Sequence, residues 1–216
     1  MRDRIKTLRE CSTAARPSIS CERAKLVTEF YRSHEADCVS VPVKRALAFH
    51  YIMANKAISI QDDELIIGER GPAPKATPTY PEICIHTLND LDILHSREKI
   101  PYSVDKECRL LYEKEIIPFW RGKSMRDRIF SEISDDWKAA YEAGIFTEFQ
   151  EQRTPGHTVL GDKIYKKGFL DIKRDIAESS ERLDFYCDRD ALDKRDELKA
   201  MEIAADALIL FAQRHA

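Results

Sequence analysis

The chain has 216 residues, of which 43 % are hydrophobic and 34 % charged, and its formal net charge is −3. This composition is too apolar for a disordered polypeptide and too balanced in charge to favour nucleic acid or an anionic membrane as a partner. Seven glycines are few for a sandwich or barrel with many tight turns. The expected fold class is therefore mainly α with a few short strands.

Helices are predicted first along the chain. Apolar residues recur at helical spacing over 2–9, 21–34 and 43–55, and Pro42 suits the first turn of the third segment. The residues at 57–61 alternate, and a β-branched run occupies 64–68, so we expect two short strands or extended segments there. The next eleven residues, 71–81, contain four prolines. We expect them to form an ordered, extended wrap and no regular element.

Helices resume after the proline-rich segment. Ser103 is the expected cap of one of them, Pro118 its expected stop, and Ser134 caps another. The predicted ranges are 82–94, 103–117, 127–133, 134–143, 162–179 and 195–216.

The last predicted helix is apolar around most of its circumference toward its end. A helix of this kind belongs inside a larger body, so Ile209, Leu210 and Phe211 are expected to lack cover in this chain alone. The sequence stops within this helix without a capping signal, which predicts a truncated polypeptide.

The six cysteines are widely spread and form no C-x-x-C pair. The N-terminus lacks the apolar segment of a secretory signal, and every apolar run is far shorter than the roughly 18 residues that a membrane span needs. We expect a reduced, cytoplasmic protein without a membrane segment, whose cysteines act as small buried hydrophobes.

Motifs for common chemistries are missing from the chain. The histidines do not pair at metal-ligand spacing, and Cys84 with His86 is only a weak signal, so no metal site is expected. The sequence contains no phosphate-binding glycine loop and no G-x-S-x-G elbow. The acid pairs 62–63 and 135–136 are expected at a turn and a helix start, where carboxylates serve structure.

One irregular stretch, 146–162, concentrates groups that bind ligands. It carries Phe146, Phe149, Arg153 and His157 together with two glycines, between predicted helices. Loops that hold polar and aromatic groups on a scaffold are common ligand sites. From the residues alone, a substrate-contacting His157 and a purely structural one both stay open.

This stretch resembles a known family. The run from Ala140 to Val159 and the run Ile164-Tyr-Lys-Lys-Gly-Phe-Leu-Asp171 look like the N-terminal domain of glycyl radical enzymes of the pyruvate formate-lyase-like group. Within that group the motifs resemble most the trans-4-hydroxy-L-proline dehydratase branch. Further signatures occur in order along the chain. They are Ile19-Ser-x-Glu-Arg23-Ala, Arg45-Ala46, Ile60-x-Asp-x-Glu-Leu-Ile-Ile-Gly68-Glu, Pro78-Thr-Tyr-Pro-Glu82 and Glu115-Ile-Ile-Pro-Phe-Trp120.

The resemblance implies a fold and a chemistry. Residues 1–216 would be the N-terminal helical part of a pyruvate formate-lyase (PFL) domain, an α/β barrel wrapped in helices. A partner enzyme that uses S-adenosylmethionine and an iron–sulfur cluster would install a radical on a glycine of the complete protein, a homodimer. By motif match, His157 and Phe149 would contact a small hydroxylated substrate, with the imidazole at a hydroxyl or carboxylate and the aromatic ring on a pyrrolidine.

The chain departs from the family at its catalytic motifs. The active-site signature G-C-V-E and the radical signature R-V-x-G-Y are both missing. We therefore expect the N-terminal fragment of a radical lyase or dehydratase, without its catalytic barrel and glycine-radical domain, without a cofactor of its own and inactive in isolation. The alternative is a non-catalytic helical module that docks on a separately encoded subunit. A self-contained helical protein of unrelated function is disfavoured by the order of the signatures.

Overall fold

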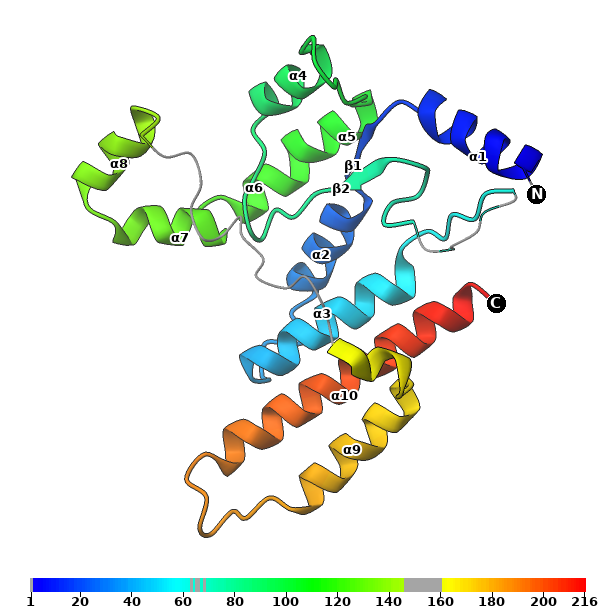
Figure 1. The fold of residues 1–216 in the computed structure, drawn as a ribbon. Helices are drawn as coiled ribbons and strands as arrows, with labels where there is room; N and C mark the ends of the chain where they lie inside the picture. The colour runs from blue at the N-terminus through cyan, green and yellow to red at the C-terminus, as the bar shows by residue number, and fades with distance from the viewer. Residues whose placement is uncertain (1, 63, 65–66, 68, 146–160) are drawn as a thin grey trace. The chain divides into compact units, whose positions relative to one another are not determined.

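The computed structural model describes residues 2–62, 64, 67, 69–145 and 161–216 (Figure 1). The chain divides into two compact units, and the division falls inside helix α2 (Glu22–Ser33). Unit 1 comprises Met1–Thr28 and Ala57–Pro155, and unit 2 comprises Glu29–Lys56 and Gly156–Ala216. Helices dominate the described residues of both units, which confirms the predicted fold class.

Unit 1 contains a two-stranded parallel sheet. Strand β1 (Ser18–Ser20) pairs with β2 (Ala76–Pro78) in the register Ser18 to Ala76 and Ser20 to Pro78. The prediction that segment 71–81 is ordered is confirmed, but three of its residues form a regular strand. Pro78 is tolerated there because it ends an edge strand, where a missing N–H breaks no ladder.

Of the two alternatives predicted for 57–61, a short strand or an extended segment, the strand is wrong, since these residues carry no strand pairing. The described residues of the second segment, Glu64 and Ile67, are not in a strand either. Backbone donors of β1 instead find acceptors far along the chain: Ser18 N–H donates to Lys75 O (3.2 Å) and Ile19 N–H to Ser103 O (2.9 Å). Pairing between distant segments decides where the strands form, and local alternation cannot show it.

Gly71 has a defined steric role in the proline-rich segment. A Cβ at this position would lie 2.4 Å from the carbonyl oxygen of Ala76. Only glycine lets the chain approach β2 this closely without moving the strand.

Side-chain caps set the helix starts of unit 1. Thr87 and Asp90 form a reciprocal capping box, so the helix predicted from residue 82 begins only at Leu88. Asp105, and not Ser103 as predicted, accepts the hydrogen bond from Cys108 N–H (2.6 Å). Ser134 caps its helix as predicted. The helices are α1 (Arg2–Ala14), α4 (Leu88–Ser96), α5 (Lys106–Leu111), α6 (Ile117–Trp120), α7 (Met125–Glu132) and α8 (Asp135–Glu142).

A π-helical turn carries the chain past Pro118. The prediction that this proline ends the helix is wrong, because η1 (Tyr112–Ile116) joins α5 to α6 without a break. Ile117 N–H donates to Tyr112 O, five residues back. The wider turn accommodates a proline that has no N–H and whose ring would clash with the carbonyl four residues before it.

Unit 2 is built on helix packing. Helix α10 (Ala191–Arg214) runs along α3 (Val41–Asn55) and α9 (Phe169–Glu181) (Figure 1). Small residues make the contact close, with Val43, Ala46 and Ala200 in one buried cluster. The single helix predicted over 162–179 is wrong: a 3₁₀ turn, η3 (Gly161–Tyr165), is separated from α9 by residues 166–168, and Gly168 precedes the first turn of α9.

The apolar end of α10 is partly covered inside unit 2. Ile209, Leu210 and Phe211, expected to lack cover, are each half-buried. The Phe211 ring lies 4.7 Å from Lys56 Nζ and 4.4 Å from the His215 ring. Unit 2 itself thus shields part of a surface that the sequence pattern assigns to a larger body.

Candidate functional site

The two residues predicted to contact substrate, Phe149 and His157, lie outside the residues that the structure describes. Their placement in a pocket therefore stays a prediction. The interactions described next lie in unit 1, where three of the motif segments quoted above contact one another.

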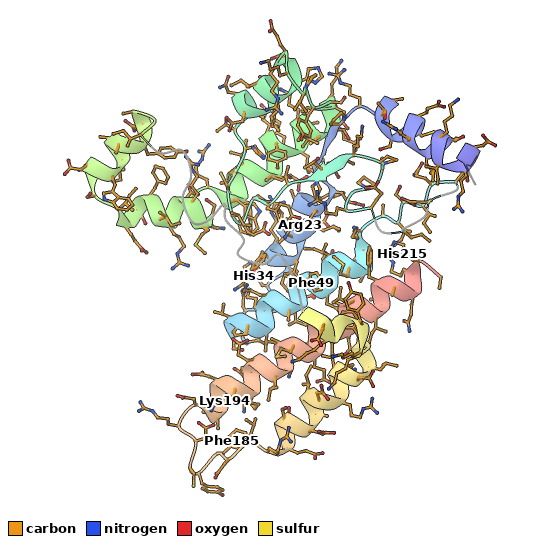
Figure 2. All side chains as sticks on the ribbon, viewed as in Figure 1. Arg23, His34, Phe49, Phe185, Lys194 and His215 are labelled. Carbon is orange, nitrogen blue, oxygen red and sulfur yellow. The ribbon has the colours of Figure 1, made fainter. Side chains whose placement is uncertain are left out.

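Arg23 joins the first motif to the proline-rich one. It is labelled on α2 in Figure 2, and its guanidinium Nη1 lies 3.1 Å from Glu82 Oε2, while Nη2 bonds Glu82 Oε1. Nη1 also donates to Thr79 O (3.3 Å), and the guanidinium carbon lies 3.9 Å from the centre of the Tyr80 ring. A two-bond arginine–carboxylate pair fixes both distance and orientation. The β1–α2 junction is thereby fixed to the residues after β2.

Trp120 joins the third motif to the same helix. Its indole N–H donates to Thr28 Oγ1 (2.8 Å), and the Thr28 hydroxyl donates to Ala24 O (2.6 Å). Trp120 is 5 % exposed and Thr28 2 %. The motif residues Arg23, Glu82 and Trp120 therefore form one scaffold, a role that their residue types alone did not reveal.

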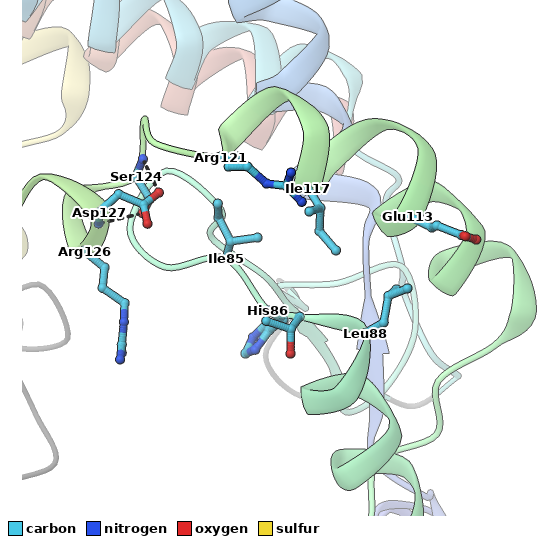
Figure 3. A pocket seen from close by; sticks show the side chains of 10 residues that line it. Ile85, His86, Leu88, Glu113, Ile117, Arg121, Ser124, Arg126 and Asp127 are labelled. Carbon is cyan, nitrogen blue, oxygen red and sulfur yellow. Dashed lines mark hydrogen bonds between the residues drawn. The ribbon is translucent and has the colours of Figure 1, made fainter. Parts of the chain in front are cut away.

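A cavity of about 550 Å³ opens beside this scaffold (Figure 3). Three segments line it: the residues before α4, the η1–α6 turn and the start of α7. The lining residues are Ile85, His86, Thr87, Leu88, Glu113, Ile117, Arg121, Ser124, Arg126 and Asp127. Its size suits a small molecule or one or two side chains.

His86 is the titratable group of greatest interest in this cavity. Burial lowers the pKa of its imidazole below the ordinary value of 6.5, with a smaller opposing effect from Asp90. The ring is therefore neutral near pH 7, with one nitrogen able to donate and the other to accept a hydrogen bond. It lies at the edge of the cavity, below Ile85 and Arg121 in the view of Figure 3.

Most other polar groups of the cavity serve structure. Asp127 Oδ2 accepts from Gly122 N–H (3.0 Å) and Ser124 N–H (3.4 Å), closing the capping box of α7. Arg126 bonds the Tyr141 hydroxyl and lies 4.8 Å from the centre of the Phe130 ring. Ser124 Oγ accepts from Asp127 N–H (3.1 Å), and the lining residues include no cysteine. The cavity can hold a small polar group.

Metal and membrane features can be stated for the described ranges. Among these residues, histidines, cysteines and carboxylates do not gather in threes to make a metal site. Helices long and apolar enough to cross a bilayer are likewise missing from the described part of the chain. All six cysteines are free.

Comparison with known proteins identifies the family. The model of the pyruvate formate lyase-like family matches residues 1–216. The chain belongs to this family. The resemblance drawn from the motifs is confirmed, and an unrelated helical protein is excluded.

Individual relatives refine the match. The chain is 52 % identical over 214 residues to trans-4-hydroxy-L-proline dehydratase of Clostridioides difficile, with 99 % of this chain and 27 % of the relative covered. It is 30 % identical over 224 residues to isethionate sulfite-lyase of Nitratidesulfovibrio vulgaris, with the same coverage. The chain thus spans about 27 % of the length of these relatives.

Solved structures of related dehydratases match the fold of this chain. The crystal structure of hydroxyproline dehydratase from Clostridioides difficile with trans-4-hydroxy-L-proline bound matches with a TM-score of 0.91 at 52 % identity, covering 98 % of this chain and 27 % of that one. The glycerol-bound B12-independent glycerol dehydratase of Clostridium butyricum matches with a TM-score of 0.87 at 26 % identity, covering 99 % and 27 %. The helical fold of the chain is therefore the fold of one part of these dehydratases.

Proposed function

We propose that this chain is the N-terminal part of a glycyl radical dehydratase that eliminates water from trans-4-hydroxy-L-proline or a related small hydroxylated substrate. One observation carries the proposal: identity is 52 % to the hydroxyproline dehydratase but 30 % to the isethionate sulfite-lyase, over nearly the whole chain in both cases. A difference of this size between branches of one family favours the branch with the higher identity.

The contribution of this chain to the reaction would be substrate contact. His157 would hydrogen-bond the hydroxyl or the carboxylate of the substrate, and Phe149 would pack on the pyrrolidine ring. Their segment joins α8 of unit 1 to η3 of unit 2.

The radical steps cannot be assigned to these residues. The chain has neither a G-C-V-E nor an R-V-x-G-Y motif, so its own residues do not fit the roles of thiyl cysteine or radical glycine. We propose that both belong to the remaining part of the parent protein, a cytoplasmic homodimer activated by an enzyme with S-adenosylmethionine and an iron–sulfur cluster. The 216-residue chain alone would be inactive.

The first test extends the DNA sequence past the codon for Ala216 in all frames. An open frame that continues to G-C-V-E and then R-V-x-G-Y supports the proposal. A stop codon with neither motif nearby leaves a docking module or a gene relic and removes the catalytic proposal.

The second test measures activity of the complete protein, activated under anaerobic conditions. It should turn over trans-4-hydroxy-L-proline faster than glycerol or isethionate. His157→Ala should lower kcat/KM while leaving the glycyl radical signal in electron paramagnetic resonance unchanged. His34→Ala is the matched control, because His34 is exposed and pairs only with Asp37 of its own loop among the described residues. Unchanged turnover in the His157 variant would remove this residue from the pocket.

A further inference from the structure

Helix α1 is the most exposed helix of unit 1. Of its residues 3–14, only Leu8 is half-buried, and all the others are exposed. Among the described residues, no other helix or strand packs along it (Figure 1). An isolated helix of 13 residues is only marginally stable in water. The exposure of α1 therefore indicates a docking surface that the described part of the chain does not supply.

Two hydrogen bonds tie α1 to the rest of unit 1. Arg4 Nη2 donates to Glu64 O (3.2 Å), and Lys75 Nζ donates to Ala15 O (3.0 Å), just after the helix ends. Arg4 and the half-buried Leu8 are four residues apart, so they share one face of the helix. This face is the one that contacts unit 1, and the rest of the helix surface stays open.

The open surface of α1 is basic. Ile5 and Arg9 are four residues apart and Lys6 and Arg9 three apart, so the three side chains lie together and form the basic face of α1. Ile5 is 52 % exposed. Lys6 Nζ lies 3.9 Å from Glu10 Oε1, whereas the Arg9 guanidinium has no hydrogen-bond or ion-pair partner among the described residues. The basic face thus presents one apolar side chain flanked by two cations.

The distribution of charge indicates the chemistry of the partner. The first 16 residues carry five basic and two acidic side chains, a net charge of +3, although the whole chain has a net charge of −3. The other 200 residues therefore carry a net charge of −6. A chain that is acidic as a whole is repelled by nucleic acid and by anionic membranes. The partner that fits the basic face is a protein surface with carboxylates around an apolar site.

The size of the basic face favours a partner within the same polypeptide. A helix of 13 residues is about 20 Å long and about 10 Å wide, so one face offers roughly 200 Å². A stable interface between separate chains needs about 800 Å² per partner. Segments of one polypeptide need less, because their covalent connection keeps them at a high effective concentration. The chain spans about 27 % of the length of its relatives, so a longer parent protein has ample further surface.

We propose that the basic face of α1 docks on an acidic surface formed by the residues that follow Ala216 in the parent protein. The inference rests on the proposed function, in which this chain is the N-terminal part of a longer polypeptide. Ile5 occupies an apolar site on that surface, and Lys6 and Arg9 pair with carboxylates around it. Helix α1 then links the beginning of the chain to the part of the protein that carries the catalytic motifs.

The first test treats the complete native protein with a carbodiimide, which joins a lysine amine to a neighbouring carboxylate as an amide and takes up the water that is lost. Peptide mapping should find Lys6 joined to an aspartate or glutamate beyond Ala216, in material that migrates as one polypeptide under denaturing conditions. The amide between Lys6 and Glu10 is the internal reference, because these groups are close within the helix itself. The proposal is overturned if that amide is the only Lys6 product, or if Lys6 is joined to a second polypeptide.

The second test measures hydrogen exchange of the α1 amides in the complete protein. Arg9→Glu reverses a charge on the basic face and should speed this exchange at least about tenfold, whereas Arg9→Lys should leave it unchanged. Thr7→Glu is the matched control, because Thr7 is exposed on the opposite side of the helix, and it should change the exchange less than about twofold. Equal acceleration by the two glutamates would assign the effect to the helix alone and overturn the proposal.

Both tests are independent of turnover. A complete protein that acts on a different substrate would contradict the proposed dehydratase activity and leave the docking result unaffected. Absence of the expected amide in a complete protein that dehydrates trans-4-hydroxy-L-proline would remove the docking proposal alone.

Discussion

The two units are held together in different ways. Unit 1 has short helices and an irregular backbone, and hydrogen bonds between distant segments, such as Arg23 to Glu82 and Trp120 to Thr28, fix its shape. Unit 2 rests on long helices that pack through buried alanines. Loss of one polar contact should therefore damage unit 1 most, whereas added volume should damage unit 2 most. The following changes test this contrast.

Trp120→Ala should have the largest effect. It removes a nearly fully buried indole and the hydrogen bond to Thr28, so the free energy of unfolding should fall by about 3–5 kcal/mol. Urea unfolding measures the loss, and hydrogen exchange should place it in unit 1. Trp137→Ala is the control at 58 % exposure and should cost about 0.5 kcal/mol. Equal losses in the two variants would contradict the packing role of Trp120.

Breaking the Arg23–Glu82 pair should come next. The two side chains are 21 % and 27 % exposed. Removal of either one leaves the other as a partly desolvated charge without its partner, so the free energy of unfolding should fall by about 3 kcal/mol. Arg23→Ala, Glu82→Ala and the double variant form a cycle. The double variant should cost much less than the sum, with a coupling of about 2 kcal/mol. Additive losses would show that the pair does not act as a unit.

Ala207→Leu probes unit 2. Ala207 is 0 % exposed on α10, so three added carbons must displace packed neighbours, at a cost of about 1–3 kcal/mol. Met201→Leu, at a position 51 % exposed on the same helix, should be nearly neutral. Thermal unfolding of the two variants compares them directly. A neutral Ala207→Leu would mean that the contact has room, and the contrast between the units would weaken.

The smallest effect should be a pH dependence from His86. Its folded pKa is lowered below 6.5 by burial, so the unfolded chain binds the proton more readily. The contribution of the neutral ring to the free energy of unfolding is fully present above pH 6.5, and it declines as the pH falls below that value. His86→Asn should flatten this acid-side decline in urea midpoints measured from pH 7 to 5. An unchanged slope would assign the decline to other groups.

The sequence pattern correctly predicted those features that depend on neighbouring residues in the chain. The positions of α2, α3 and α10 followed from apolar spacing, and the Ser134 cap followed from its residue type. Strands β1 and β2 were missed because each has three residues and depends on pairing across about sixty positions of chain. The π turn at Pro118 was missed because local rules predict a stop there. The lining of the cavity comes from three segments, so no single motif reveals it, and the roles of Phe149 and His157 stay predictions.

The contact between Arg214 and α3 has a consequence for the timing of folding. Arg214 donates to Met53 O (2.6 Å) and Lys56 O (2.7 Å), carbonyl groups at the end of α3 that a helix cannot satisfy by itself. Met53 and Arg214 are 161 positions apart, so at ribosomal speeds of about 5–20 residues per second the end of α3 is made about 10–30 s before its partner. Until then water must hydrate these carbonyls. Unit 2 can complete its structure only after its last helix leaves the ribosome, whereas β1 and β2 of unit 1 can pair while the chain is less than half made.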